Sequence, residues 1–194
     1  MIFLISISDY QMSLISISYF LTPFSFYYID ENFRNYFSKN RNEFLDKTFN
    51  FFNEFGEGQY HLIGYGLIYL YSKIRNDKKI GEFARTGIKS FLMSGITVLG
   101  LKFIIGRSRP YMNNGPVYFS PFSLNNDYQS LPSGHTIVAF NTSSHIYKYN
   151  KFLGILSYSI AFGTGLARIY KDQHWFSDVL SGAVLGIIIG SNTK

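Results

Sequence analysis

The sequence predicts an all-α fold: a multi-pass membrane bundle of about six transmembrane helices, with an amphipathic helix lying at the membrane interface. Charged residues make up only 15% of the 194 residues, well below the roughly 25% that is usual for soluble domains. These charges gather in a few segments and leave long apolar runs between them. The length fits a single membrane-embedded domain that covers residues 1–194.

The positive charge and the cysteine content narrow the possible functions. Residues 73–89 hold six basic and two acidic side chains between two apolar runs, which is typical of a cytoplasmic membrane loop. A nucleic-acid binder with a net charge of +6 would concentrate that charge on a polar face, so no nucleic-acid partner is predicted. Since the chain has no cysteine, disulfides, cysteine nucleophiles and thiolate metal sites are excluded.

The N-terminal third predicts two membrane-associated segments. Residues 1–28 are largely apolar and aromatic, and the first basic residue is Arg34, so a membrane helix is favoured over a cleaved signal. A cleaved signal would leave five transmembrane helices. Residues 30–58 interleave charged side chains with phenylalanines, which predicts an amphipathic helix at the interface.

The remaining apolar runs predict the transmembrane helices. Each is near or below the ~20 residues that a bilayer requires. They cover residues 60–71, 90–106, 132–149, 152–167 and 179–190.

Alternation of these runs across the membrane assigns the connecting segments to two faces. Residues 73–89, the short turn at 148–151 and Lys194 fall on one face, which the positive-inside rule makes cytoplasmic. The opposite face receives the segments that are rich in polar residues: 30–58, the predicted loop 107–131, and 168–177.

The first polar cluster on that face runs from Lys102 to Pro110. An ionisable lysine in an apolar helix is a functional candidate, although a lysine that reaches toward lipid headgroups is the plainer alternative. Lys102 and Arg109 are about two helical turns apart and would share a face if the helix continued that far. Arg107 lies between them, and only an electrostatic supporting role is expected for it.

The second cluster is the stretch from Pro132 to His135. A proline in the first helical turn, followed by Ser133 and Gly134, leaves backbone N–H groups free to bind an anion at the positive end of the helix dipole. His135 lies beside this cradle and suits proton transfer. An ordinary helix cap is the alternative.

The third cluster contains Arg168, His174 and Asp178. If a helix begins near His174, the i,i+4 spacing places His174 and Asp178 on one face. The carboxylate then fixes the proton on one ring nitrogen and leaves the other free to attack. A surface histidine near a helix cap is the alternative. His61 and His145 lack such a motif, and a structural role is expected for both.

Together the three clusters point to a phosphate group as their ligand. Three cations, a helix N-terminus, two histidines and one aspartate suit phosphoryl transfer, which depends mainly on positioning and charge stabilisation. Two histidines and one carboxylate could hold a metal ion, but the surrounding cations would repel it. No metal and no cofactor are therefore predicted.

These motifs, in this order, resemble the type-2 phosphatidic acid phosphatase superfamily. That family carries Lys-x6-Arg-Pro, then Pro-Ser-Gly-His, then Ser-Arg-x5-His-x3-Asp, and the matching core covers residues 90–190. The chain departs from the pattern at one position, where Ala167 stands in place of serine. This substitution removes a possible hydroxyl contact with phosphate and is expected to affect binding or substrate preference.

The resemblance implies a metal-independent phosphatase that acts on a lipid phosphate or diphosphate through a phosphohistidine. His174 would be the nucleophile, Asp178 would orient it, and His135 would protonate the leaving oxygen and then activate water. The phosphoryl oxygens would be held by Lys102, Arg109, Arg168, Ser133 and the backbone of Gly134.

The expected partners are a lipid phosphate and the surrounding membrane lipids, and the sequence does not indicate an oligomeric state. The expected location is a bacterial inner membrane, with the site facing the periplasm or exterior. The alternatives are a soluble-substrate acid phosphatase, a relative of the vanadate haloperoxidases, and a non-catalytic protein that binds phospholipid headgroups. The short chain and its apolar runs argue against the first two alternatives, and the intact histidines argue against the third.

Overall fold

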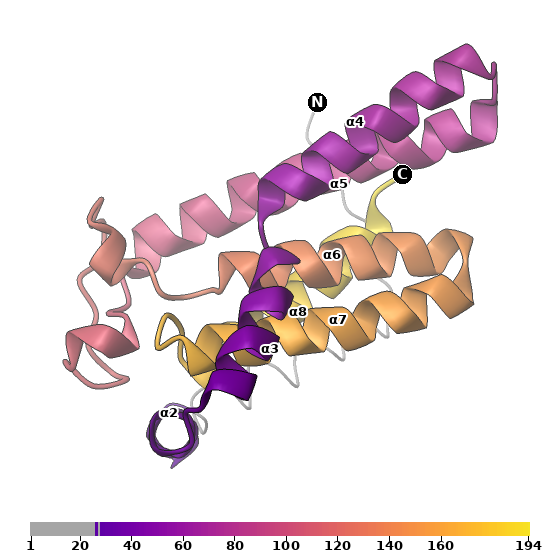
Figure 1. Ribbon diagram of the computed structural model, residues 1–194. Coiled ribbons are helices and arrows are strands. Elements are labelled where there is room, and N and C mark those ends of the chain that lie inside the picture. Colours follow the sequence, from indigo (N-terminus) through magenta and orange to yellow (C-terminus); the bar gives the residue numbers. More distant parts are fainter. Residues whose placement is uncertain (1–25, 27) are drawn as a thin grey trace.

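The computed structural model describes Phe26 and residues 28–194, and this part of the chain is all-helical (Figure 1). The predicted helix or signal at residues 1–28 lies almost entirely outside the described residues. Two 3-10 turns, Pro110–Met112 and Asn126–Tyr128, interrupt the polar segment between α5 and α6. Among the described residues, the α-helices are α2 (Asp30–Lys39), α3 (Glu43–Glu54), α4 (Gly58–Ile74), α5 (Lys78–Ile105), α6 (Gly134–Tyr149), α7 (Lys151–Tyr170) and α8 (Phe176–Asn192).

Helix α6 forms the centre of the bundle and packs between α7 and α8. Small residues let α8 approach its backbone closely. A Cβ atom at Gly182, Gly186 or Gly190 would lie 2.7, 2.6 and 2.3 Å from backbone oxygens of α6. Stripes of small residues at this spacing are typical of tightly packed membrane helices.

The basic segment 73–89 is not the loop that its charge predicts. Helix α4 ends at Ile74, and α5 begins at Lys78, where the Asp77 side chain accepts hydrogen bonds from the N–H groups of Lys79 and Ile80 at 2.9 and 3.0 Å. Lysine and arginine are good helix formers, and an N-cap carboxylate favours a helix start, so only a short turn separates the two helices.

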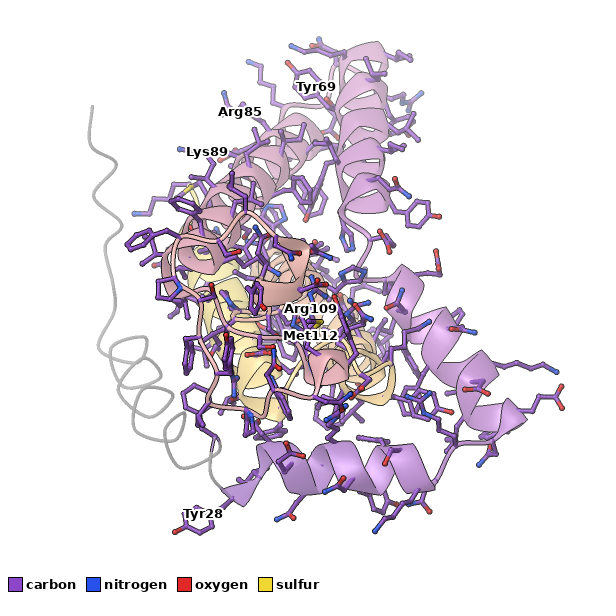
Figure 2. The ribbon with its side chains drawn as sticks, turned by 90° about the vertical axis from the view of Figure 1, so that its left-hand side faces the viewer. Tyr28, Tyr69, Arg85, Lys89, Arg109 and Met112 are labelled. Carbon is purple, nitrogen blue, oxygen red and sulfur yellow. The ribbon has the colours of Figure 1, made fainter. Side chains whose placement is uncertain are left out.

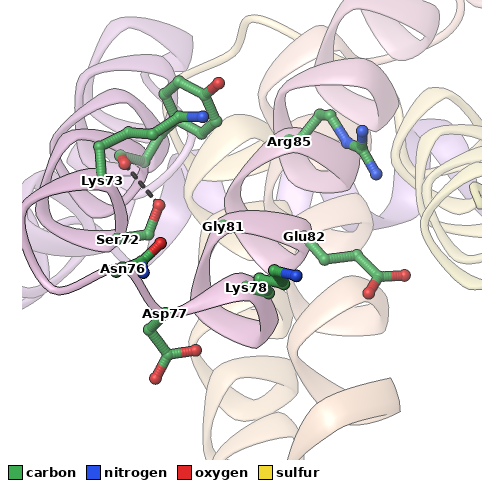
Figure 3. Close-up of a pocket in the computed structure, with 9 residues that line it drawn as sticks. Ser72, Lys73, Asn76, Asp77, Lys78, Gly81, Glu82 and Arg85 are labelled. Atoms are coloured by element: carbon green, nitrogen blue, oxygen red, sulfur yellow. Dashed lines mark hydrogen bonds between the residues drawn. The ribbon is translucent and has the colours of Figure 1, made fainter.

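The tip of the α4–α5 hairpin carries a polar hollow of about 330 Å³ (Figure 3). Lys73 and Asn76 line it from the end of α4, and Glu82 and Arg85 line it from the start of α5. The hairpin tip and the α6–α7 turn lie at one end of the bundle, while the segment 107–131 lies at the other (Figure 1).

The segment 30–58 also differs from the prediction, because it forms two helices instead of one. Asn42, between the two helices, is the N-cap of α3, and its side chain accepts a hydrogen bond from the N–H of Leu45 at 2.9 Å. Helix α2 is seen end-on in Figure 1 and therefore lies across the axes of α6 and α7. Helix α3 packs against α7 through Phe49 and Tyr170.

In the part of the chain that the structure describes, two helices, α5 and α7, are long and apolar enough to cross a membrane, and α8 is a shorter apolar helix. The predicted number of about six spans therefore remains a prediction. At the end of the bundle that carries the α4–α5 hairpin tip, Lys148 Nζ donates a hydrogen bond to the carbonyl of Thr193 at 2.7 Å. Figure 2 looks onto the opposite end, with Arg109 and Met112 of the segment 107–131 near its centre.

Candidate active site

Lys102 lies in the last turn of α5 and points into the protein interior, with only 8% of its surface exposed. The helix ends at Ile105, because Gly106 adopts a left-handed conformation (φ 63°) and its N–H closes the last turn on the carbonyl of Lys102. The helix therefore does not continue to Arg109, and the condition for a helix face shared by Lys102 and Arg109 is not met. The Lys102 ammonium donates to the carbonyl of Gln129.

Arg109 connects the segment 107–131 to the turn between α7 and α8. Its Nε and Nη2 donate to the carbonyl and side-chain oxygens of Asn126 at 2.9 and 2.8 Å. Its Nη1 donates to Oε1 of Gln173 at 2.9 Å. Since Gln173 directly precedes His174, these contacts hold the first and third motifs together.

The second motif forms the N-terminus of α6. Ser133 is the N-cap residue and Gly134 begins the helix, so Pro132 lies before the helix and not in its first turn as expected. The cradle itself is present, because the first N–H groups of an α-helix have no intrahelical acceptor. The backbone N–H of Ser133 donates to the carbonyl of Asp178 at 3.0 Å, which joins the second motif to the third.

His135, in the first turn of α6, contacts a residue that the sequence did not single out. Its Nε2 lies 3.0 Å from Oε1 of Glu57, in the connection between α3 and α4. Gly56 packs against the same imidazole, and a Cβ atom there would lie 2.5 Å from Cβ of His135. From the sequence, this connection was predicted only as a helix end, on the basis of its two glycines.

His174 lies just before α8, which begins at Phe176. Its Nδ1 is 3.6 Å from Oδ2 of Asp178, slightly longer than a hydrogen bond. The ring is 2% exposed, and burial lowers the pKa of His174 well below its ordinary value, against the opposing effect of Asp178. The imidazole is therefore neutral at neutral pH, which is the form that can act as a nucleophile.

The Asp178 carboxylate is fixed by three donors besides its approach to His174. Oδ2 accepts hydrogen bonds from Ser130 Oγ at 2.5 Å and from the backbone N–H of Trp175 at 2.9 Å. Oδ1 accepts one from Arg107 Nη1 at 2.6 Å. Ser130 Oγ also lies 3.5 Å from Nδ1 of His174 and therefore bridges the two side chains.

Arg107 is fully buried and bridges two carboxylates. Its Nη2 donates to Oδ2 of Asp30 at 2.7 Å, while Asp30 also accepts from the N–H and hydroxyl of Ser177 at 2.8 and 2.7 Å. Burial raises the pKa of Asp30, and the charge of Arg107 opposes this. Arg107 thus ties helix α2 to Asp178, which is a larger role than the expected electrostatic support. No local sequence pattern had singled out Asp30.

The three predicted phosphate-binding cations converge around the two histidines. The charges of Lys102 and Arg168 act on both His174 and His135, and Arg109 repels both Lys102 and Arg168. Arg168 donates through Nη1 to Oδ1 of Asn53 at 2.6 Å, and its buried Nε has no hydrogen-bond partner among the residues that the structure describes. The site therefore concentrates positive charge that only an anion would balance.

His145 and Ala167 are buried, and His61 is partly exposed. His145 hydrogen-bonds with Tyr65 and Thr86 at 3.1 and 3.0 Å, in line with the structural role expected for it. His61 lies 2.6 Å from the carbonyl oxygen of Phe55 and 2.8 Å from the Thr142 hydroxyl. Ala167 is fully buried and packs with Phe49 and Tyr170, in the contact between α3 and α7.

Sequence comparison matches the profile of the PAP2 superfamily to residues 88–193. The chain is 35% identical over 103 residues to a lipid A 1-phosphatase of Porphyromonas gingivalis, which covers 51% of this chain and 20% of that protein. It is 39% identical over 59 residues to the bacitracin transport permease protein BcrC of Bacillus licheniformis, which covers 30% of this chain and 29% of that protein. The chain thus spans less than a third of the length of these two curated relatives.

Two solved structures share the fold. LpxE of Aquifex aeolicus superposes with a TM-score of 0.63 and 27% identity, over 82% of this chain and 90% of that chain. A PAP2-type phosphatidylglycerolphosphate phosphatase of Bacillus subtilis superposes with a TM-score of 0.66 and 19% identity, over 93% and 92% of the two chains. The second likeness concerns the fold alone.

Proposed function

Because this chain belongs to the PAP2 superfamily, we propose that it is a membrane phosphatase that removes phosphate from a lipid phosphate or diphosphate without a metal ion. The observation that carries this proposal is the placement of the two histidines. His135 lies in the first turn of α6 and His174 lies just before α8, and the charges of Lys102 and Arg168 act on both rings. A phosphoryl group bound by these cations would meet one histidine as nucleophile and the other as proton donor.

In the first step, Nε2 of His174 attacks phosphorus while Nδ1 keeps its proton toward Asp178. The N–P bond forms as the P–O bond to the lipid breaks, and His135 gives its proton to the leaving oxygen. The 3.6 Å separation of His174 and Asp178 shortens as positive charge develops on the imidazole, since a charged donor forms a shorter hydrogen bond to a carboxylate. Arg107 and Ser130 hold the carboxylate in place during this change.

In the second step, His135 takes a proton from water, and the water oxygen attacks phosphorus. The N–P bond breaks, inorganic phosphate leaves, and His174 returns to its neutral form. Lys102, Arg109 and Arg168, with the N-terminus of α6, stabilise the charge on the phosphoryl oxygens in both steps. No metal ion is required, because these fixed positive groups perform the charge stabilisation.

The membrane setting makes a lipid the natural carrier of that phosphate. The relatives named as a lipid A 1-phosphatase and LpxE support a lipid substrate for this chain. The end of the bundle that carries the site is opposite the basic tip of the α4–α5 hairpin (Figure 1). By the positive-inside rule, that tip is cytoplasmic, and the site faces the periplasm or exterior of a bacterial inner membrane.

The test is phosphate release from a panel of lipid phosphates and diphosphates, by purified protein in detergent with EDTA present. We expect release by the wild-type protein and none by the His174→Ala variant. Release that requires an added metal ion, or that persists at the wild-type rate in His174→Ala, would remove the proposed mechanism. Absence of release from every lipid, with the protein folded, would remove the lipid phosphatase assignment.

A further inference from the structure

An open hollow of about 420 Å³ adjoins the candidate site beside Arg168. Helix α3 and the segment that leads into it form one side, and the end of α7 with the following turn forms the other. Six of the residues that line it matter here: Arg41, Asn50, Asn53, Arg168, Lys171 and Gln173. None of the three sequence motifs accounts for Arg41, Asn50 or Lys171.

We propose that this hollow, the second anion site, binds a second phosphate group of the same substrate while the first phosphate reacts at His174. The second anion site is defined by Arg41, Asn50 and Lys171. The inference rests on the proposed function and deepens it, because it selects substrates that carry two phosphates over those that carry one.

The charge of the hollow fits an anionic ligand. Arg41, Lys171 and Arg168 line it together with a single carboxylate, Asp46. Oδ1 of Asp46 already accepts a hydrogen bond from the Tyr170 hydroxyl at 2.6 Å. The hollow therefore keeps an excess of positive charge, which a phosphate would balance.

The two outer cations are held in place by uncharged groups. Arg41 Nη2 donates to the carbonyl of Tyr170 at 2.9 Å, and its guanidinium lies 5.4 Å from the centre of the Tyr170 ring. Lys171 Nζ donates to Oδ1 of Asn50 at 2.6 Å. Neither cation forms an ion pair within the part of the chain that the structure describes. Both are thus oriented without being neutralised.

The hollow shares Arg168 and Gln173 with the site where the first phosphate would react. Arg168 lines it and also acts electrostatically on His174, and its buried Nε has no hydrogen-bond partner among the described residues. Gln173, another lining residue, accepts the hydrogen bond from Arg109. A ligand that spans both places would contact Arg168 between its two phosphates.

A second phosphate has two possible sources in a membrane lipid. It is the lipid-linked phosphate of a polyprenyl diphosphate, whose terminal phosphate would react at His174, or a phosphate on the far side of a phosphorylated sugar headgroup. The guanidinium and ammonium groups recognise the same oxygens in either case, so the experiment carries one arm for each source. In each arm a lipid with two phosphates is compared with the matching lipid that lacks the second phosphate.

The experiment measures kcat/KM on both pairs of lipids for the full chain and for Arg41→Gln and Lys171→Gln. We expect each variant to lower kcat/KM for the two-phosphate lipid about ten-fold more than for its one-phosphate partner, in one arm at least, since one charge-assisted contact is lost. The arm that responds identifies the source. Lys47→Gln is the matched control, because Lys47 lies on α3 outside the hollow and pairs with Glu43 at 2.7 Å; all rates should stay unchanged.

Arg41→Lys tests whether the loss in Arg41→Gln comes from a folding defect, since it keeps the charge while altering the contacts with Tyr170. It should retain more of the two-phosphate preference than Arg41→Gln. Parallel losses on both members of each pair, or no loss on either, would overturn the second anion site while leaving the phosphatase intact. Absence of His174-dependent release from all four lipids would overturn the second anion site and the proposed function together.

Discussion

Arg107 Nη1 donates a hydrogen bond to Oδ1 of Asp178 at 2.6 Å, and both side chains are fully buried. The other nitrogen of the same guanidinium holds Asp30 of α2 at 2.7 Å. A buried charge that loses its partner is strongly destabilised. Arg107 is therefore a positioning residue for Asp178, and helix α2 is part of the support of the site.

Arg107→Lys keeps the positive charge but removes the planar fork that serves two carboxylates. We expect kcat to fall by about ten-fold and the unfolding free energy to fall by about 2–4 kcal/mol, since one buried carboxylate is left poorly paired. Phosphate release and thermal unfolding in detergent measure the two effects. Arg34→Lys is the control, because Arg34 binds Asp172 at 2.7 Å with both side chains partly exposed, and its stability loss should stay below ~1 kcal/mol. Equal effects in the two variants would contradict the role of Arg107.

Asp30→Asn removes one of the two carboxylates on Arg107 and preserves the shape of the side chain. The contacts with Ser177 and Arg107 then lose their charge-assisted character, and we expect about 1–3 kcal/mol of stability to be lost. The loss should shrink when Arg107→Met is already present, because the two side chains interact directly. A double-mutant cycle on thermal stability measures this coupling, and strict additivity would show that the contact contributes nothing.

Glu57→Gln tests whether the carboxylate beside His135 supports proton donation to the leaving oxygen. Without the charge, a lipid alkoxide, which is a poor leaving group, should depart about ten-fold more slowly. An activated aryl phosphate needs little protonation, so its rate should change less than two-fold on the same grounds. Glu54→Gln, at the end of α3, is the matched control. A uniform slowing of both substrates would show that Glu57 acts only through local structure.

The buried imidazole of His174 predicts where activity is lost on the acidic side. Its pKa is lowered from the ordinary 6.5, so the neutral nucleophilic form persists below that pH and is lost only when the pH falls through the lowered value. We expect the acidic limb of kcat/KM to lie below pH 6.5, after correction for substrate ionisation measured by phosphorus NMR. An acidic limb above 6.5 that does not follow the substrate would contradict a neutral, buried His174.

Much of the site could be predicted from the sequence, because its candidate catalytic and phosphate-binding residues lie in short motifs. Lys102, Arg168, His135 and His174 were predicted from residue type and spacing, and the structure brings their charges and rings together. The all-α class was predicted from apolar runs and is confirmed for the described residues. Such motifs can be recognised in the sequence because each is a short stretch at the ends of helices.

The residues that support the site could not be predicted from the sequence, because their partners are distant in the chain. Asp30 meets Arg107 across 77 positions, Glu57 meets His135 across 78, and no local pattern indicates either contact.

The helix boundaries around residues 73–89 were predicted wrongly for a different reason. The charges of residues 73–89 are typical of a segment next to the membrane. Lysine and arginine are also good helix formers, so these charges do not distinguish a loop from a helix. The charge pattern therefore yields a membrane side, which stays a prediction, and does not indicate the local structure.

The most direct measurement is to trap the phosphorylated enzyme with a lipid substrate labelled in its phosphate, in the presence of EDTA. Rapid denaturation should capture label that is stable to alkali and lost in acid, as expected for phosphorus bound to a histidine nitrogen. Peptide mapping should place it on His174, and His174→Ala should carry none. Label on another residue, or turnover with no label under conditions that trap the wild-type intermediate, would contradict the central claim.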